Sequence, residues 1–325
     1  MSDQRGGGIS WTDQTWNPIR GCSRVNASCI HCYAEGVAIR FSKPGLAYEG
    51  LVRLSTTPGQ GDRAIGWNGV VRMVPEHLAD PLRWKRPRRI FVNSMSDLFH
   101  EALPFADIAA IFETMAQAPR HTFQVLTKRP ERMRHFMEGM PAFALPHIHL
   151  GVSVGNQDEA DDFIPELLDT PSAVRWVSYE PAHGPVNFHA FLRGALRDEC
   201  LAILRRGDTT PTPGLDWIVV GGESGKGARP FDLAWAESTV EQCRAAGVPV
   251  FVKQLGAHPI DATEQDVVGP DGSVHYTREA GNELLTEAAQ RPGYSIVPHR
   301  VRFKDRAGAD PWEWPRELWV QEFPR

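Results

Sequence analysis

Cysteine is scarce in this sequence, with five residues among 325, and those five are unevenly spread. Cys22, Cys29 and Cys32 lie in one short stretch, whereas Cys200 and Cys243 lie alone. A disulfide framework needs an even, dispersed set of cysteines, as in small secreted proteins. The sequence therefore predicts free thiols in a reducing compartment, where clustered thiolates bind metals.

Long apolar runs are also lacking. No stretch approaches the roughly 18 consecutive apolar residues that a membrane span requires. Residues 1–8 are polar and rich in glycine, without the apolar segment of a signal peptide. We therefore expect a cytoplasmic protein with no membrane partner.

Positive charge is not in excess, because 35 lysines and arginines face 40 aspartates and glutamates, a net charge of −5. This balance argues against a protein that coats nucleic acid through its overall charge. One local run is basic and includes a tryptophan able to stack on a base: Arg83, Trp84, Lys85, Arg86, Arg88 and Arg89. This run is either a nucleic-acid contact or a solvated segment before the next strand.

The sequence does contain a regular alternation of short apolar segments with helical or polar ones, in a composition that is 42% hydrophobic and 23% charged. The apolar segments lie at 9–20, 89–94, 122–126, 148–153, 174–178, 215–220 and 248–252. Helical periodicity follows at 33–41 and 105–117 and from Glu131 onward. This rhythm predicts an α/β fold in which parallel strands form a full or partial (β/α) barrel.

The length suits such a barrel with an appendage, since these barrels take about 200 to 250 residues. We expect the barrel at 1–257, with surface insertions at about 42–89 and 193–214. Residues 258–325 are expected to form a C-terminal extension or lid. Its tryptophans, Trp312, Trp314 and Trp319, are predicted to pack against the barrel rather than to stack on bases.

The three clustered cysteines predict a metal site. Three protein ligands leave one position open on a tetrahedral zinc ion, and three cysteines leave one iron open on a four-iron cluster. An open position implies chemistry on water or on a substrate. The alternative is a closed structural zinc site completed by His31 or by a distant residue.

Polar side chains collect where the predicted strands end, and in barrels of this type the loops after the strands build the active site. The residues expected to converge there are Cys22, Cys29, Cys32, Asn93, Ser94, Asp97, Lys128, Ser153, Asn156, Glu180, Glu223 and Lys253. Taken singly, any of them could instead cap a helix or lie in a solvated loop.

The cysteine stretch after the first strand resembles the cluster-binding loop of the radical S-adenosylmethionine (SAM) superfamily. More specific motifs resemble the phage Gp37/Gp68 family, whose function is unknown, over nearly the whole chain. They are Trp11-Thr-Asp-x-Thr-Trp-Asn-Pro, Cys32-Tyr-Ala-Glu, Met95-Ser-Asp-Leu-Phe, Leu126-Thr-Lys-Arg, Gly151-Val-Ser-Val, Glu180-Pro, Gly221-Gly-Glu-Ser, Val252-Lys-Gln-Leu-Gly and Trp314-Pro.

The superfamily resemblance implies a [4Fe-4S] cluster on Cys22, Cys29 and Cys32, with SAM bound to the fourth iron. It implies reduction by an external one-electron donor of the flavodoxin or ferredoxin type. Cleavage of SAM would then give a 5′-deoxyadenosyl radical that abstracts hydrogen from the substrate. Two departures are that six residues separate Cys22 from Cys29, where three are usual, and that Gly-Gly-Glu follows the sixth strand rather than the second.

The same resemblance implies roles for other residues in binding SAM. His31 would contact the adenine, Ser96 and Asp97 the amino group, Lys128 or Lys253 the carboxylate, and Ser153 and Asn156 the ribose. Asp97 would accept a hydrogen bond from the ammonium and compensate its charge.

The sequence thus predicts a radical SAM enzyme with Glu180, Glu223 and Lys253 as candidate catalytic residues. The basic run and the phage-family resemblance favour DNA or RNA as a partner, with a base modified or repaired. One alternative is a zinc-dependent hydrolase or nuclease that uses a zinc-bound water. The other is a zinc-stabilised nucleic-acid-binding protein without catalysis.

Overall fold

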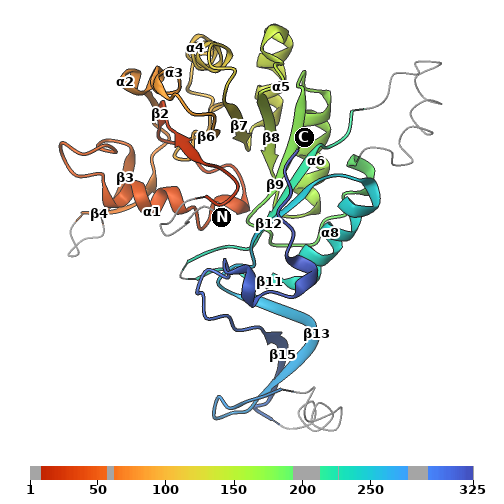
Figure 1. Cartoon of the computed structure of the whole chain (residues 1–325). Coiled ribbons are helices and arrows are strands. Elements are labelled where there is room, and N and C mark those ends of the chain that lie inside the picture. The colour runs from red at the N-terminus through yellow and green to blue at the C-terminus, as the bar shows by residue number, and fades with distance from the viewer. Residues whose placement is uncertain (1–8, 57–61, 193–212, 226, 277–291, 325) are drawn as a thin grey trace.

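The computed structural model describes residues 9–56, 62–192, 213–225, 227–276 and 292–324. Its centre is a sheet of seven parallel strands in the order β1-β6-β7-β8-β9-β10-β12, curled into a half-barrel (Figure 1). The strands are β1 (Gln14–Trp16), β6 (Arg89–Val92), β7 (Thr122–Thr127), β8 (Ile148–Ser153), β9 (Val174–Tyr179), β10 (Trp217–Gly221) and β12 (Val250–Gln254). Each overlaps a predicted apolar segment, so the predicted α/β class is confirmed and the barrel is partial.

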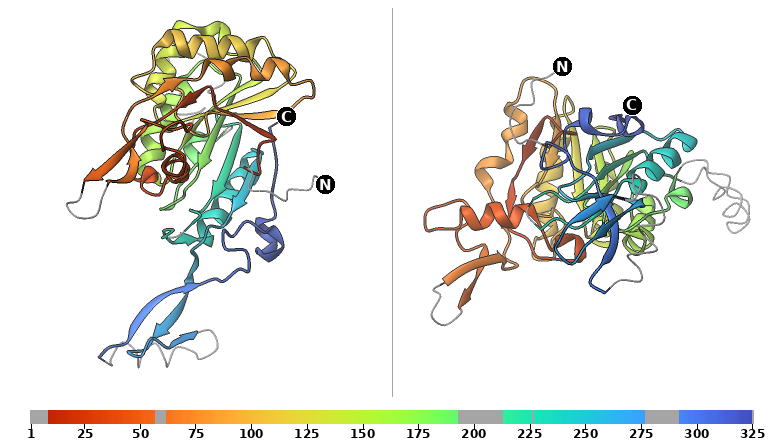
Figure 2. Two further views of the ribbon diagram at one scale, coloured as in Figure 1. Left: turned by 90° about the vertical axis from the view of Figure 1, so that its left-hand side faces the viewer. Right: turned by 90° about the horizontal axis from the view of Figure 1, so that it is seen from below.

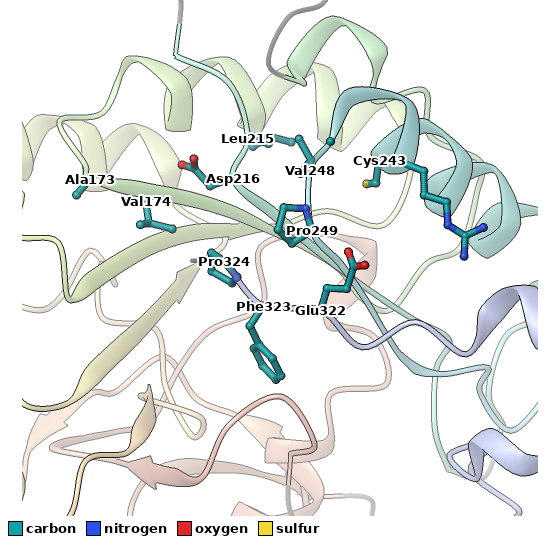
Figure 3. A pocket seen from close by; sticks show the side chains of 12 residues that line it. Ala173, Val174, Leu215, Asp216, Cys243, Val248, Pro249, Glu322, Phe323 and Pro324 are labelled. Atoms are coloured by element: carbon teal, nitrogen blue, oxygen red, sulfur yellow. The ribbon is translucent and has the colours of Figure 1, made fainter.

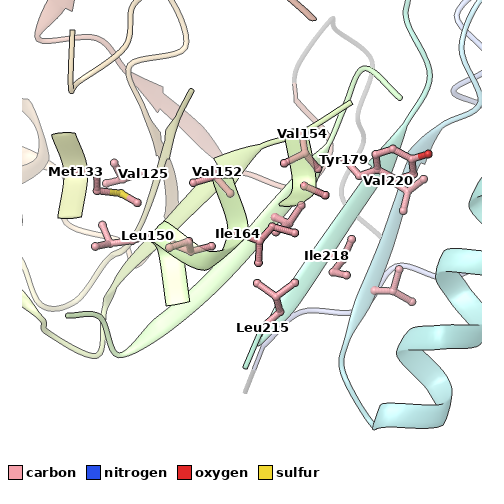
Figure 4. Packing of buried hydrophobic residues seen from close by; sticks show 14 of the residues in the cluster. Val125, Met133, Leu150, Val152, Val154, Ile164, Tyr179, Leu215, Ile218 and Val220 are labelled. Atoms are coloured by element: carbon pink, nitrogen blue, oxygen red, sulfur yellow. The ribbon is translucent and has the colours of Figure 1, made fainter. Parts of the chain in front are cut away.

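In the described part of the chain, four helices cover the convex face of this sheet: α4 (Phe105–Ala116), α5 (Pro130–Gly139), α6 (Gln157–Asp169) and α8 (Leu233–Ala246). They bury one apolar stripe each, and in α4 this is the predicted stripe of Ile108, Ile111, Phe112 and Met115. Alternate strand residues face these helices and form the main core, part of which Figure 4 shows around Val152, Ile164 and Ile218. Buried on both faces, the strands read as apolar runs.

The concave face is filled by aromatic side chains rather than by a channel. Trp11, Phe91, Trp176, Trp217 and Phe251 form a second buried cluster there. Gly151 of β8 is the cross-strand neighbour of Trp176, and a Cβ on Gly151 would lie 2.5 Å from that indole ring. The glycine therefore makes room for the tryptophan, which forms the floor of the half-barrel.

Residues 42–89 contain regular elements where an irregular insertion was predicted. Helix α1 (Tyr33–Arg40) packs against the hairpin of β3 (Val52–Thr56) and β4 (Asp62–Trp67). Then follow β5 (Arg72–Met73), which pairs with β2 (Ile19–Arg20), and the short helices α2 (Pro75–Leu78) and α3 (Asp80–Arg83). The prediction of irregular structure was wrong, because these short elements, whose hairpin packs on a separate small core, carry little apolar signal in the sequence. The predicted insertion at 193–214 lies almost entirely outside the described residues.

The C-terminal part forms an arm and a strap. The arm consists of β13 (Pro259–Val268), β14 (Val274–Tyr276) and β15 (Ser295–Arg300), joined to β11 (Phe231–Asp232), and it projects away from the half-barrel (Figure 2). After η4 (Pro311–Glu313) and η5 (Arg316–Leu318) the chain returns along β12, where Val252 donates to the Val320 carbonyl at 2.8 Å. This returning segment, residues 319–324, is called the strap here. It covers the outer side of β12, the last strand of the sheet, which would otherwise be unpaired.

The three C-terminal tryptophans do not behave alike. Trp314 is buried as predicted, and its indole N–H donates to the Gly308 carbonyl at 3.0 Å. Trp312 is 77% exposed and meets Trp319 edge to face, so the packing prediction is wrong for Trp312. No helix in the described part of the chain is long and apolar enough to cross a bilayer.

Candidate functional site

The cysteine loop, residues 21–32, leaves the end of β2 and leads into α1, with one short helix, η1 (Ala27–Cys29), within it. Gly21 starts the loop at φ +96°, and a Cβ there would lie 2.1 Å from the Val70 carbonyl oxygen. Only glycine fits this backbone and this close approach. Gly21 therefore sets the position of Cys22, the next residue in the loop.

All three loop cysteines line one cavity of about 150 Å³, called the thiol cavity here, and all three are free thiols. Asn93, at the carboxyl end of β6, lines the same cavity, and its buried Nδ2 has no hydrogen-bond partner among the described atoms. The cavity thus combines three soft metal ligands with a buried polar donor. This donor set fits a cluster held by three cysteines, which the sequence predicted.

Burial makes the thiols of Cys22 and Cys32 hard to ionise without a metal. It raises the pKa of Cys22 to about 12, and the nearby Asp97 carboxylate adds to the effect. Burial also raises the pKa of Cys32, although backbone N–H groups at the start of α1 and the Lys128 ammonium oppose it. A metal must therefore displace protons from Cys22 and Cys32 as it binds.

The cysteines are spread over the cavity wall. Within the described ranges, no group of three or more His, Cys, Asp or Glu side chains comes close enough together to hold one metal ion. A four-iron cluster sets a different requirement, because each cysteine binds a separate iron.

Asp97 and Arg129 form a buried ion pair at 3.1 Å beside the cysteine loop, with side chains 8% and 6% exposed. The Asp97 carboxylate also accepts hydrogen bonds from the Thr127 hydroxyl and from the backbone N–H groups of Phe99 and Lys128. Arg129 donates to the Ser23 hydroxyl at 2.9 Å. Asp97 is therefore occupied by internal donors and, through Arg129, holds the first residue after Cys22.

A second cavity of about 160 Å³, the adjoining cavity, lies next to the first and shares six lining residues with it. The shared residues are Ser28, Cys32, Tyr33, Phe91, Leu126 and Lys128. Trp11 lines the adjoining cavity as well, and its buried indole N–H has no partner among the described atoms. Its walls therefore combine aromatic faces with polar groups, as small-ligand sites usually do.

The polar groups of the adjoining cavity form one chain of contacts. Lys128 Nζ donates to Ser153 Oγ at 2.7 Å, and Ser153 Oγ donates to the Glu180 carbonyl at 3.0 Å. The Glu180 carboxylate pairs with Lys253 and accepts from Gln254 at 3.4 Å. Residues from the ends of β7, β8, β9 and β12 thus meet, as the barrel rule predicts.

Glu223 lines the adjoining cavity but is bound to Arg229 by a two-point ion pair, with Nη2 to Oε1 at 2.9 Å. Arg229 also donates to the Ala27 carbonyl of the cysteine loop at 3.2 Å. Glu223 therefore orients Arg229, and Arg229 in turn holds the cysteine loop at Ala27.

The predicted residues separate into three groups. Cys22, Cys29, Cys32, Ser96, Asp97 and Lys128 line the thiol cavity, with Asn93 and Ser94. His31, Ser153, Glu180, Glu223 and Lys253 line the adjoining cavity, which Lys128 also borders. Asn156 lines neither, because its side chain caps α6 by accepting from the Glu159 N–H at 2.9 Å. Ser96 donates to the Ile19 carbonyl at 3.1 Å.

The basic run is not brought to either cavity. It leads into the amino end of β6. This end of the strands, called the amino edge here, is opposite the carboxyl edge, where the thiols lie. Several members have internal partners: Arg83 pairs with Asp80, Arg88 lies over Trp84, and Arg89 pairs with Asp13. Lys85 and Arg86 are exposed.

A larger cavity of about 910 Å³ lies at the same amino edge (Figure 3). Its walls come from residues that precede β9, β10 and β12, with Cys243 and the strap residues Glu322 and Phe323. Burial raises the pKa of the Cys243 thiol to about 12. This cavity gathers neither a catalytic group of the predicted set nor a cluster of free cysteines.

Sequence reasoning missed several residues that hold the cysteine loop, among them Arg129, Glu159, His183 and Arg229. Arg129 belongs to the Leu126-Thr-Lys-Arg motif, in which only Lys128 was predicted to be a site residue. Glu159 stands three residues after Asn156, where a glutamate is ordinary in a capping box. His183 and Arg229 gave no signal, because their contacts with the loop span 155 and 202 residues.

The fold and the two cavities define a class: a parallel α/β half-barrel with a three-thiol cavity at the carboxyl edge of its sheet. The chain belongs to the family described as a protein of unknown function (DUF5131), whose model matches residues 6–314. No curated protein and no solved structure matches the chain.

Proposed function

We propose that the chain is a radical SAM enzyme that carries one [4Fe-4S] cluster in the thiol cavity. The observation that supports this best is the convergence of Cys22, Cys29 and Cys32 on one cavity beside a second, aromatic and polar cavity. The position at the carboxyl edge of a parallel half-barrel is the one that the resemblance to the radical SAM superfamily implies for the cluster.

Cys22, Cys29 and Cys32 would hold the cluster, which when bound supplies the electron for reductive cleavage of SAM, after reduction by a flavodoxin- or ferredoxin-type donor. Lys128 borders both cavities and makes a hydrogen bond to a neutral hydroxyl rather than an ion pair in the contacts described. A carboxylate of SAM at the boundary would find this ammonium within reach. Phe91, which is shared by both cavities and buried, would help to exclude water from this ammonium.

The adjoining cavity would hold the part of SAM next to the cluster, because about 160 Å³ is too small for the whole of SAM together with a substrate. His31 and Trp11 offer aromatic faces, and the Trp11 indole offers a free donor. The Glu180 and Lys253 pair is the group best suited to hold or move a proton there, because it borders the cavity. Glu223 contributes through Arg229 rather than directly.

The proposed substrate, a nucleic-acid base, depends on the phage-family resemblance. The basic run at Arg83–Arg89 does not add to it, since that run lies at the amino edge of the sheet. A substrate of another class would leave the proposed reaction type unchanged.

Anaerobic purification with iron and sulfide analysis, followed by a 5′-deoxyadenosine assay, tests the proposal. We expect about four irons and four sulfides per chain and reductant-dependent formation of 5′-deoxyadenosine. Cys29→Ala should lose both, whereas Cys243→Ala, at the opposite edge, should lose neither. Stoichiometric zinc without sulfide would overturn the proposal in favour of a zinc hydrolase or nuclease. Salt-dependent binding of DNA or RNA without SAM cleavage would favour the non-enzymatic alternative.

A further inference from the structure

Ser28, the residue directly before Cys29, is held by two side chains that are distant from it in the sequence. Its hydroxyl donates to Glu159 Oε2 at 3.0 Å and lies 3.1 Å from His183 Nε2. Glu159 belongs to the first turn of α6, and His183 follows β9. The serine is buried and borders both cavities.

The anchor is a built site rather than a chance contact. Glu159 is 9% exposed and also accepts from the Gly155 N–H at 2.7 Å. A Cβ on Gly155 would lie 2.3 Å from His183 Nε2 and 2.7 Å from Ser28 Oγ, so only glycine admits both side chains. Burial raises the pKa of Glu159, but the nearby His183 imidazole and the hydrogen bonds from Gly155 and Ser28 outweigh it, and the net shift is downward.

These three residues do not form a catalytic triad. In a triad the carboxylate and the serine bind opposite nitrogens of the imidazole. Here Glu159 lies 3.8 Å from Nε2, the nitrogen that faces Ser28, and it binds Ser28 directly. The arrangement therefore holds the serine in place rather than activating it.

The loop needs such an anchor because six residues separate Cys22 from Cys29. Ser28 and Cys29 lie together in η1, so a displacement of Ser28 displaces the Cys29 thiol. Arg129 holds the loop at Ser23 and Arg229 holds it at Ala27. The third anchor acts next to the ligand itself.

We propose that Glu159 and His183 are positioning residues that, through Ser28, fix the Cys29 thiol in the thiol cavity; the cluster they would serve rests on the proposed function. The loop of this chain is wider than the usual loop of the superfamily. Glu159 of α6 and His183 after β9 hold the wider loop in place through Ser28. Groups of this kind, one step removed from the ligands, set metal affinity by orienting them.

The test compares Glu159→Gln, His183→Ala and Ser28→Ala with the matched control Glu166→Gln. Glu166 lies on the same helix and pairs with Arg134 at 2.6 Å, and it borders neither cavity. In the reconstituted protein we expect roughly ten-fold faster loss of iron to a chelator in the first three variants and an altered electron paramagnetic resonance spectrum. The control should match the wild type.

A second readout needs no cluster. In metal-free protein, iodoacetamide labelling mapped by mass spectrometry should modify Cys29 several-fold faster in the three variants than in the wild type and the control. Equal labelling and equal iron retention would overturn the inference, even if melting temperatures fell. A wild-type chain that binds no cluster would overturn the proposed function instead, while faster Cys29 labelling would still support the anchor. Ser28→Ala removes one hydroxyl, so it keeps the test valid if another variant fails to fold.

Discussion

At the scale of single residues, the cysteine loop is held by charged side chains that are themselves buried. Asp97 is the clearest case, because its carboxylate accepts four hydrogen bonds, one of them from Arg129. Breaking one side of a buried ion pair leaves the partner charge uncompensated. The loop geometry therefore depends on residues that need not touch a cofactor.

Asp97→Asn should lower the free energy of unfolding by about 3 kcal/mol, because it removes the buried charge that faces Arg129 and leaves that arginine paired, among the described residues, only with Glu101, which is 66% exposed. Urea unfolding of the metal-free chain measures this. The matched control is Asp13→Asn, whose pair with Arg89 is 44% and 34% exposed and should cost at most about 1 kcal/mol. Equal costs for the two variants would contradict the account.

His149 predicts a pH effect on stability. Burial lowers the pKa of this histidine, on the concave face of β8, to about 4. Below pH 6.5 the unfolded chain binds a proton at this histidine, whereas the folded chain does not. The free energy of unfolding that this group contributes is therefore present above pH 6.5 and falls as the pH drops toward 4. The loss from this group approaches roughly 3 kcal/mol at pH 4.

His149→Gln should weaken that acid dependence, because glutamine does not titrate. Melting temperature measured from pH 7.5 to pH 4 gives the comparison. Parallel curves for the wild type and the variant would show that His149 is not held neutral by the fold.

At the scale of elements, one glycine in a strand is required by its neighbours, whereas one glycine in a helix is not. Gly151→Ala should lower the free energy of unfolding by about 1 to 3 kcal/mol, since the new methyl group would meet the Trp176 ring. Gly36→Ala, in the middle of α1 with no atom within 4 Å of its Cβ, should raise it by about 0.5 to 1 kcal/mol. Denaturant unfolding measures both, and effects of the same sign would refute the packing described here.

The seven sheet strands could be predicted because burial on both faces leaves continuous apolar runs. The β13–β15 arm could not be predicted, since its strands pair with each other and expose residues on both sides, which leaves no alternation to read. The three thiols were found because they are close in sequence. The anchor of Ser28 was not, because Glu159 and His183 lie 131 and 155 residues away.

At the scale of the whole molecule, the two edges of the sheet differ. The carboxyl edge carries both cavities and the cysteine loop, whereas the amino edge carries the basic run and the cavity of Figure 3. A nucleic-acid substrate bound at the amino edge would lie on the other side of the sheet from the thiols. This separation makes the carboxyl edge the place to look for substrate contacts.

Loading the thiol cavity should also stabilise the entire chain, because a group that binds only the folded state shifts unfolding by mass action. We expect a higher melting temperature for the cluster-loaded chain than for the same chain after chelation under anaerobic conditions. Cys29→Ala should show no such difference. Identical melting before and after removal of iron would contradict a cluster held between the cysteine loop and the strand ends.

The most direct test of the central claim is electron paramagnetic resonance of the reduced, anaerobic protein with and without SAM. The account predicts a reduced [4Fe-4S] signal that changes when SAM is added, since three cysteines leave one iron open to it. It also predicts that Cys29→Ala abolishes the signal. A chain that contains zinc and no iron–sulfur signal, or a signal that SAM leaves unchanged, would contradict it.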